Sequence, residues 1–296
     1  MQRWRIVSVC STLFLVAAPA GAEVSASAGA QVSASTGKHP PPCQGNEKQD
    51  CIPADVAIYA PFDLRVGRWD LEGTTRDYSP TQFTVGLNPD LTLHARGATS
   101  RSRIFANMGG GNSGFEWNFG GIWTFGGRLS LGQGKQGGLF GRIGIDGYLG
   151  GNSDFYHSHL AAPRLELGYQ LFKTDSLFVE AAGHGALMLV GRHRVFDRTR
   201  DIGFSMSAGG FVTVQMRFLR VQLDAMRIFE GAHQPKTPID RGSADLCGIL
   251  SGLGLCITAS SERGEVWSAD QGVDTHADFI GFKVSGVDAD IIGYAL

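Results

Sequence analysis

Apolar and polar residues alternate with a period of two over most of the chain between residues 62 and 229. The clearest stretch is Phe115–Leu131, whose odd positions read Phe, Trp, Phe, Gly, Trp, Phe, Gly, Leu and Leu. Its even positions include Glu116, Asn118, Thr124 and Arg128. Because successive side chains of a strand point to opposite faces, this segment predicts a β-strand with one aromatic face and one polar face.

The same alternation recurs along the chain, and no segment of convincing length has a helical period. The predicted strands are Phe62–Glu72, Gln82–Ala95, Phe115–Leu131, Leu139–Leu149, Pro163–Lys173, Leu177–Gly191, Phe204–Phe218 and Leu219–Phe229. The alternation changes phase between Phe218 and Leu219, which predicts a tight turn or a bulge at that point. Arg96–Gly114 and Gly150–Ala162 are expected to be loops.

Two further strands would improve the arrangement of the connections. A strand near Pro53–Ala60 and a closing strand near Ala277–Gly286 raise the expected number from eight to ten. They also place the longer connections at one end of a barrel, as in outer-membrane barrels. Residues 231–276 are then expected to be a long loop or an appendage.

The two faces of the predicted strands differ in chemistry. The apolar aromatic face carries Phe115, Trp117, Phe119, Trp123, Phe125 and Tyr169. The polar face carries Glu116, Arg128, Arg142, Asp146, Arg164, Glu166, Glu180, His184, Arg217, Arg220 and Asp224. A membrane barrel turns its apolar face outward, whereas a soluble barrel turns it inward. Strands of ten or more residues, aromatic side chains and opposite charges close in sequence favour the membrane barrel, with the soluble β-protein as the alternative.

Composition narrows the function classes. The chain has 296 residues, of which 43% are hydrophobic and 18% charged, with a formal net charge of −2. This balance excludes a basic nucleic-acid-binding protein and a fully disordered chain. The chain has 42 glycines, many of them inside the predicted strands, as strongly curved sheets require.

The N-terminal residues predict export. Met1–Ala22 has the charged start, the short apolar run and the Ala20-Gly21-Ala22 cleavage site of a secretory signal peptide. Glu23–Pro53 is rich in Ser, Ala, Gly and Pro, which predicts a flexible leader with a small cysteine loop. Residues 54–296 are expected to form the barrel domain.

Four cysteines follow the signal peptide in two close pairs, Cys43 with Cys51 and Cys247 with Cys256. An exported protein meets an oxidising compartment, so two disulfides with short loops are predicted. Pairing between the two ends of the chain stays open, because spacing does not fix connectivity.

The segment Tyr156-His157-Ser158-His159 holds the weak catalytic candidates, His157, Ser158 and His159. In an extended segment the two histidines share a face and Ser158 points away, although a base must reach its nucleophile. Metal binding would need further ligands such as Asp154, and no metal site is predicted. The alternative is that this segment has no chemical role and is a polar loop or the end of a strand.

A basic run follows further along the chain. Arg192, Arg194, Arg198 and Arg200 fall between two predicted strands. Guanidinium groups suit the phosphates of lipopolysaccharide, and a solvated loop is the alternative.

The chain resembles Gram-negative outer-membrane β-barrel proteins as an architectural class, on its signal peptide, alternating strands and glycine content. The resemblance implies an all-β antiparallel barrel of eight to ten strands in the outer membrane, in contact with its lipid or lipopolysaccharide. The expected role is non-enzymatic: structural, small-solute transport or surface interaction, with no cofactor and no nucleic acid. A secreted or periplasmic soluble barrel that binds a ligand is the first alternative, and an outer-membrane lipid hydrolase is the second.

Overall fold

The computed structural model describes most of the predicted barrel domain, namely residues 54–60, 62–73, 75–95, 97–131, 137–173, 177–229, 238–268 and 271–286. The predicted signal peptide and leader, with Cys43 and Cys51, lie outside these residues. Asp50–Leu296 forms a compact unit of its own. None of the described residues belongs to a helix long and apolar enough to cross a membrane.

The regular elements of the described residues are all β-strands, as the period-two pattern predicts. They are β1 (Ala54–Tyr59), β2 (Asp63–Glu72), β3 (Thr81–Leu87), β4 (Asp90–Ala95), β5 (Ala98–Gly111), β6 (Gly114–Ser130), β7 (Gly137–Gly151), β8 (Phe155–Lys173), β9 (Leu177–Val195), β10 (Arg198–Asp201), β11 (Ser205–Met216), β12 (Leu219–Phe229), β13 (Ile239–Leu250), β14 (Leu253–Ser268) and β15 (Gln271–Gly286).

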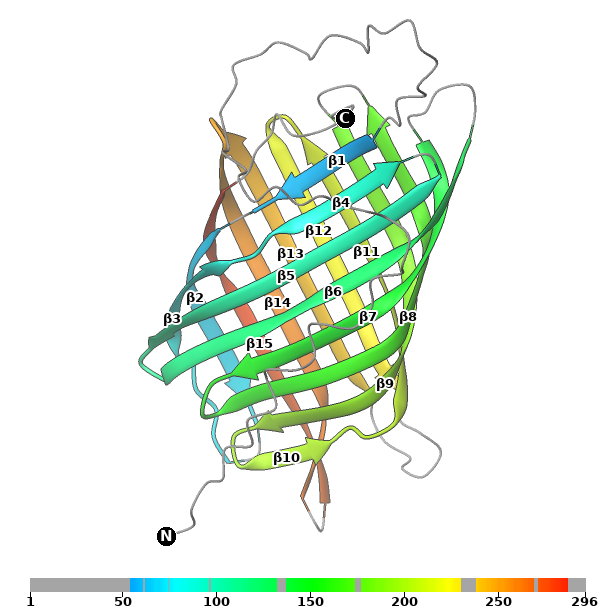
Figure 1. Cartoon of the computed structure of the whole chain (residues 1–296). Helices are drawn as coiled ribbons and strands as arrows, with labels where there is room; N and C mark the ends of the chain where they lie inside the picture. Colours follow the sequence, from blue (N-terminus) through cyan, green and yellow to red (C-terminus); the bar gives the residue numbers. More distant parts are fainter. Residues whose placement is uncertain are drawn as a thin grey trace, which may run out of the picture. The chain divides into compact units, whose positions relative to one another are not determined.

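Antiparallel pairing closes these strands into a barrel (Figure 1). Neighbours in the wall are neighbours in sequence, and β15 pairs with β2 to complete the ring. Strands β3 and β4 pair with successive parts of β5 and form one wall strand interrupted at Asn88 and Pro89. The wall therefore has twelve strands, and the predicted all-β antiparallel barrel is confirmed.

Two short strands lie outside the ring. Strand β1 pairs only with β4, and β10 pairs only with β9. Figure 1 shows them at opposite ends of the barrel. We call the end with β1 and the short turns at 96–97, 217–218 and 251–252 the hairpin end, and the end with β10 and the connection 73–80 the loop end.

Twelve wall strands exceed the eight to ten expected, because two predicted loops hold three further wall strands, while a third predicted loop lengthens a predicted strand. Arg96–Gly114 holds β5, Gly150–Ala162 holds the start of β8, and residues 231–276 hold β13 and β14. The predicted turn after β11 is present, since β11 ends at Met216 and β12 begins at Leu219. The predicted strand near Ala277–Gly286 is present as β15 and closes the ring, whereas the strand near Pro53–Ala60 is present as β1 but is not the barrel strand expected there, because it pairs only with β4.

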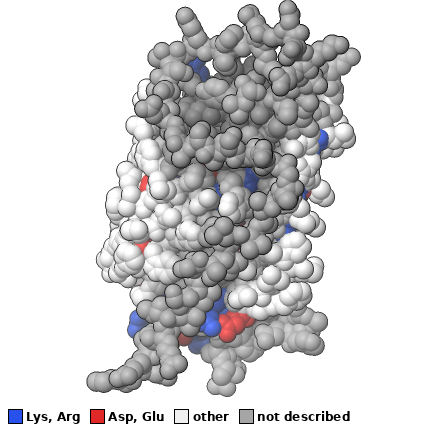
Figure 2. All heavy atoms as spheres, viewed as in Figure 1, with Lys and Arg blue, Asp and Glu red and all other residues white. Residues whose placement is uncertain are grey.

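The outer face of the wall is apolar. All six members of the predicted aromatic face are exposed, and Phe125 and Leu167 keep 67% and 73% of their surface accessible. In the view of Figure 2 the described wall is mostly uncharged, and charged side chains gather at the loop end. Such a surface suits lipid rather than water, because large contiguous apolar patches are rare on soluble monomers.

Candidate functional site

The inner face of the barrel carries the polar side chains. Ten of the eleven residues expected on the polar face point inward, alternating with exposed neighbours along their strands: Glu116, Arg128, Arg142, Asp146, Arg164, Glu166, Glu180, His184, Arg220 and Asp224. Arg217 differs, because it is exposed at the turn between β11 and β12. Strand β11 ends at Met216, two residues before the predicted end at Phe218, and this leaves Arg217 in the turn.

Strands β7, β8 and β9 hold a dense set of buried ion pairs. The Arg142 guanidinium lies 2.9 Å from Glu166 and 2.6 Å from Glu180. The Arg164 guanidinium lies 2.8 Å from Glu166 and 2.8 Å from Asp146. We call these five residues the ion-pair core. Because each charge has an opposite partner, the core can fill this side of the lumen without leaving a bare buried ion.

Two more arginines connect β4 and β5 to β11 and β12 across the lumen. Arg101 of β5 pairs with Asp90 at 3.1 Å and lies over the Phe211 ring of β11 at 4.0 Å. Arg220 of β12 lies 3.8 Å from the same carboxylate and 3.1 Å from the centre of the Tyr59 ring. These contacts cross the barrel near the hairpin end, where they narrow the lumen.

Strand β1 also narrows the lumen at the hairpin end. Ala57 packs with Phe172 and Phe178, next to the β8–β9 connection. The Tyr59 hydroxyl lies 3.1 Å from the sulfur of Cys247, which forms a disulfide with Cys256 between β13 and β14. One of the two predicted disulfides is thus present, and β1 reaches from β4 to the far wall.

A polar cavity of about 320 Å³ lies inside the barrel beside β2, β13, β14 and β15. This volume is at the small end of the range for small-molecule sites, roughly 300–1,000 Å³. Its lining mixes charged, amide, hydroxyl and aromatic groups, among them Asp63, Arg65, Trp69, Asn88, Arg103, Asn107, Glu116, Asn118, Tyr148, Asp224, Arg241, Ser243, Asp245, Ser260, Glu262 and Lys283. The groups that line it can exchange hydrogen bonds with water or a small hydrophilic solute.

Charge pairs border this cavity. Lys283 lies 2.5 Å from Asp245 and 3.7 Å from Asp63. Arg65 lies 3.6 Å from Glu116, which also interacts with the Trp69 side chain. These charged groups border the cavity, where a solute or water can exchange hydrogen bonds with them.

The two predicted histidine candidates belong to a buried cluster on the inner face. His157 Nε2 lies 2.9 Å from His159 Nδ1, and His159 Nε2 lies 3.1 Å from Asp146. His193 Nε2 lies 2.7 Å from Glu262, which also pairs with Arg241 at 2.8 Å. These contacts join β7, β8 and β9 to β13 and β14, so the cluster is a second link across the lumen.

The cluster does not place its groups as nucleophilic catalysis or metal binding would require. Ser158 is half-buried on the opposite face of β8 from its two histidine neighbours, so it is not placed for attack with their help. Among the described residues no group of three His, Cys, Asp or Glu side chains is arranged to hold a metal ion.

The loop end ties most of the basic run to neighbouring groups. Arg192 pairs with Asp201 at 2.7 Å, and Arg194 and Arg200 donate to the backbone oxygens of Asn152 and Glu265. Contact of this run with lipopolysaccharide stays a prediction.

Tyr78 lies in the 73–80 connection and donates a hydrogen bond to Asp154. Burial and this hydrogen bond raise the pKa of the Tyr78 phenol.

Several charged residues of the lumen were missed from the sequence. Arg101 lies in an expected loop, Arg241, Asp245 and Glu262 lie in the expected long loop, and Lys283 lies in the closing strand. A usable signal was available for Lys283, which alternates with Phe282 and Val284. Arg101, Arg241 and Glu262 are flanked by small or polar residues, which give no contrast between faces, and Asp245 has an apolar neighbour only in Leu246.

Comparisons with known proteins concern the fold alone. No family model matches the chain, and no curated protein sequence matches it. The translocator domain of the autotransporter NalP from Neisseria meningitidis is 14% identical, with 78% of this chain and 88% of that chain covered at a TM-score of 0.32. The NanC porin is 10% identical, with 76% and 98% covered at a TM-score of 0.39. The beta domain of the Bordetella autotransporter BrkA is 13% identical, with 78% and 99% covered at a TM-score of 0.33.

Proposed function

We propose that this protein is an outer-membrane β-barrel that lets small hydrophilic solutes pass through a narrow lumen. The apolar outer face supports residence in a membrane, because outer-membrane barrels turn such a face to lipid. The predicted signal peptide supports export. Outer-membrane lipid is then the partner of the outer face.

The polar cavity is the observation that carries the transport role. A barrel with a purely structural role needs no unfilled space, yet about 320 Å³ remains between charged and amide side chains. A cavity with such a lining holds water, because water needs several polar partners to enter a protein interior. The solutes that fit are of the size of an amino acid or a monosaccharide.

The lumen is restrictive at the hairpin end. Tyr59 packs between the disulfide and Arg220, and Asp90 is held by Arg101 of the neighbouring strand β5 and approached by Arg220 from the opposite wall. We therefore expect slow passage in the wild type and faster passage when this closure is loosened.

Solute uptake by vesicles tests the proposal. The full chain, reconstituted in phosphatidylethanolamine and phosphatidylglycerol vesicles, should allow swelling in glycine or arabinose and not in raffinose. Tyr59→Ala should speed swelling severalfold, because it removes the ring that fills the hairpin end. Tyr169→Ala, which removes an exposed aromatic ring of the outer face, is the matched control and should leave the rate unchanged.

A negative result has a specific meaning. If neither the wild type nor Tyr59→Ala admits glycine, although both shift on a gel after boiling as folded barrels do, the transport proposal fails. The dense ion-pair core would then favour a purely structural barrel, since side chains 0–2% exposed, such as Arg142, Arg164 and Glu166, already occupy much of the interior.

A further inference from the structure

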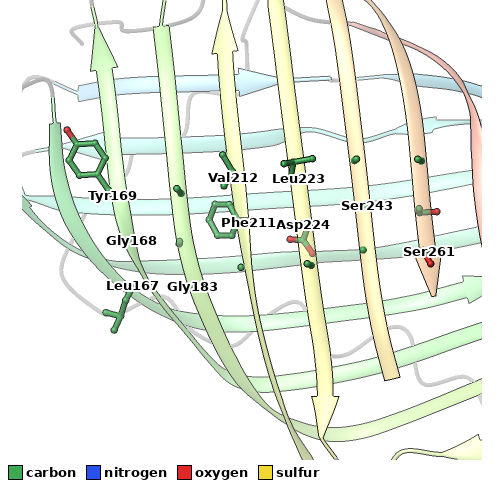
Figure 3. Close-up of a pocket in the computed structure, with 18 of the residues that line it drawn as sticks. Leu167, Gly168, Tyr169, Gly183, Phe211, Val212, Leu223, Asp224, Ser243 and Ser261 are labelled. Carbon is green, nitrogen blue, oxygen red and sulfur yellow. The ribbon is translucent and has the colours of Figure 1, made fainter. Parts of the chain in front are cut away.

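The outer wall carries a groove of about 1250 Å³ that crosses β8 to β15 (Figure 3). Figure 3 shows Leu167 and Tyr169 at one end, Val212 and Leu223 near the middle and Ser261 at the other end. We call this feature the outer groove. It lies on the face opposite the cavity of the lumen, so it is separate from the proposed route of solutes.

Two neighbouring rows of outward residues line the outer groove. One row consists of directly paired residues on successive strands: Leu167, Gly183, Gly210, Ala225, Gly242, Ser261 and Asp278. The second row consists of Tyr169, Ala181, Val212, Leu223, Ala244, Ala259 and Ile280. Because most members are Gly, Ala or Ser, the backbone between the two rows forms the floor of the groove.

Packing of the barrel does not require two of the three glycines in these rows, whereas a Cβ atom at Gly210 would lie 3.1 Å from the backbone oxygen of Ala182. A Cβ atom at Gly183 or Gly242 would come no closer than 3.8 Å to another residue, which is ordinary contact. Glycine inside a strand weakens it, because it has no side chain to pack and loses more entropy on folding. Gly183 and Gly242 therefore keep the groove open at a cost in stability, and a ligand bound in the groove can offset that cost.

The groove lies where the outer surface changes character. Toward the hairpin end the next outward row is apolar and includes Val221, Leu246, Ile257 and Phe282. Toward the loop end the next row is charged on β12 to β14, where Arg227 pairs with Asp240 at 2.6 Å and Arg263 lies 3.7 Å from Asp278. A ligand of the outer groove must therefore have an apolar part next to a charged part.

We propose that the outer groove binds one zwitterionic phospholipid. An acyl chain lies along the small-residue floor, and the phosphate meets the guanidinium groups of Arg227 and Arg263. The ammonium group meets the carboxylates of Asp240 and Asp278. Arginine suits phosphate through its parallel N–H donors, and alternating charges along the rim match a headgroup that carries both signs.

Native mass spectrometry tests this assignment. The full chain, freed of lipid in detergent and mixed with phosphatidylethanolamine, should retain one phospholipid. The double variant Gly183→Leu, Gly242→Leu fills the groove and should lose it. Gly248→Leu is the matched control, because Gly248 is also an outward glycine with no atom within 4 Å of a Cβ there, and it lies outside the groove.

The outcomes are distinct from those of the transport test. Retention of the lipid by the groove-filled variant, with a gel shift on boiling that shows it is folded, overturns the proposal. Dimers that disappear in the same variant also overturn it, since the groove would then hold a second copy of the chain. A lipid that both the groove-filled variant and Gly248→Leu lose is not held by the groove, and this too rejects the assignment.

Discussion

Both sides of the lumen are polar, but they are packed in different ways. On the β7–β9 side Arg142 and Glu166 face each other as direct partners on neighbouring strands, and neither side chain is exposed. On the β13–β15 side the corresponding partners Ser243 and Ser260 are short and leave the cavity open. Long charged side chains in matched pairs thus fill a barrel, whereas small hydroxyl side chains between charged ones leave room for solvent.

The contrast predicts that charge removal is most damaging in the ion-pair core. Glu166→Gln removes the charge that two arginines share and leaves them buried without full compensation. We expect a loss of about 3–5 kcal/mol in the free energy of unfolding, as for breaking a buried pair. Urea unfolding of the full chain in phospholipid vesicles, followed by tryptophan fluorescence, measures it. A loss under about 1 kcal/mol would erase the distinction between the two sides.

The cavity side should tolerate the same kind of change better. Lys283→Met removes the partner of Asp245 and Asp63, but these carboxylates border the cavity and can be hydrated there. We expect a loss of about 1–2 kcal/mol, between the values for exposed and buried pairs. The same unfolding experiment applies. If Lys283→Met lowers the free energy of unfolding as much as Glu166→Gln does, water does not hydrate these carboxylates in the cavity.

The smallest effect is expected at the outer surface. Arg227 and Asp240 form a close pair, but both side chains are about half exposed on the outward face. Arg227→Gln should leave the free energy of unfolding nearly unchanged, because an exposed ion pair contributes little to stability. The measurement is best made in detergent without phospholipid, so that loss of a bound headgroup does not contribute.

Period-two alternation was sufficient for the fold class and for most strands, because aromatic and charged residues on β6 differ so strongly between faces. It failed on β5 and β13 for a physical reason. The outward positions of β5 begin with Ala98, Ser100 and Ser102, and those of β13 include Gly242 and Ala244. Small residues suit the outer wall but give no contrast with a polar inner face.

It was easier to predict which residues face inward than to predict which of them contact each other. Local strand pairing brings Arg142 to Glu166, which alternation can suggest. The contacts of Arg220 with Asp90 and of Tyr59 with Cys247 join positions more than 100 residues apart. Such contacts depend on the tilt and stagger of the strands around the closed barrel. A local sequence pattern does not contain this information.

The disulfide inside the barrel sets an order for assembly. Cys247 and Cys256 are buried within the closed wall beneath Tyr59, where neither an oxidising enzyme nor a reducing thiol can reach the sulfur atoms. They belong to one β-hairpin, so the bond needs only local structure to form. Oxidation of this hairpin therefore precedes barrel closure, so the bond forms while β13 and β14 are still a hairpin open to solvent.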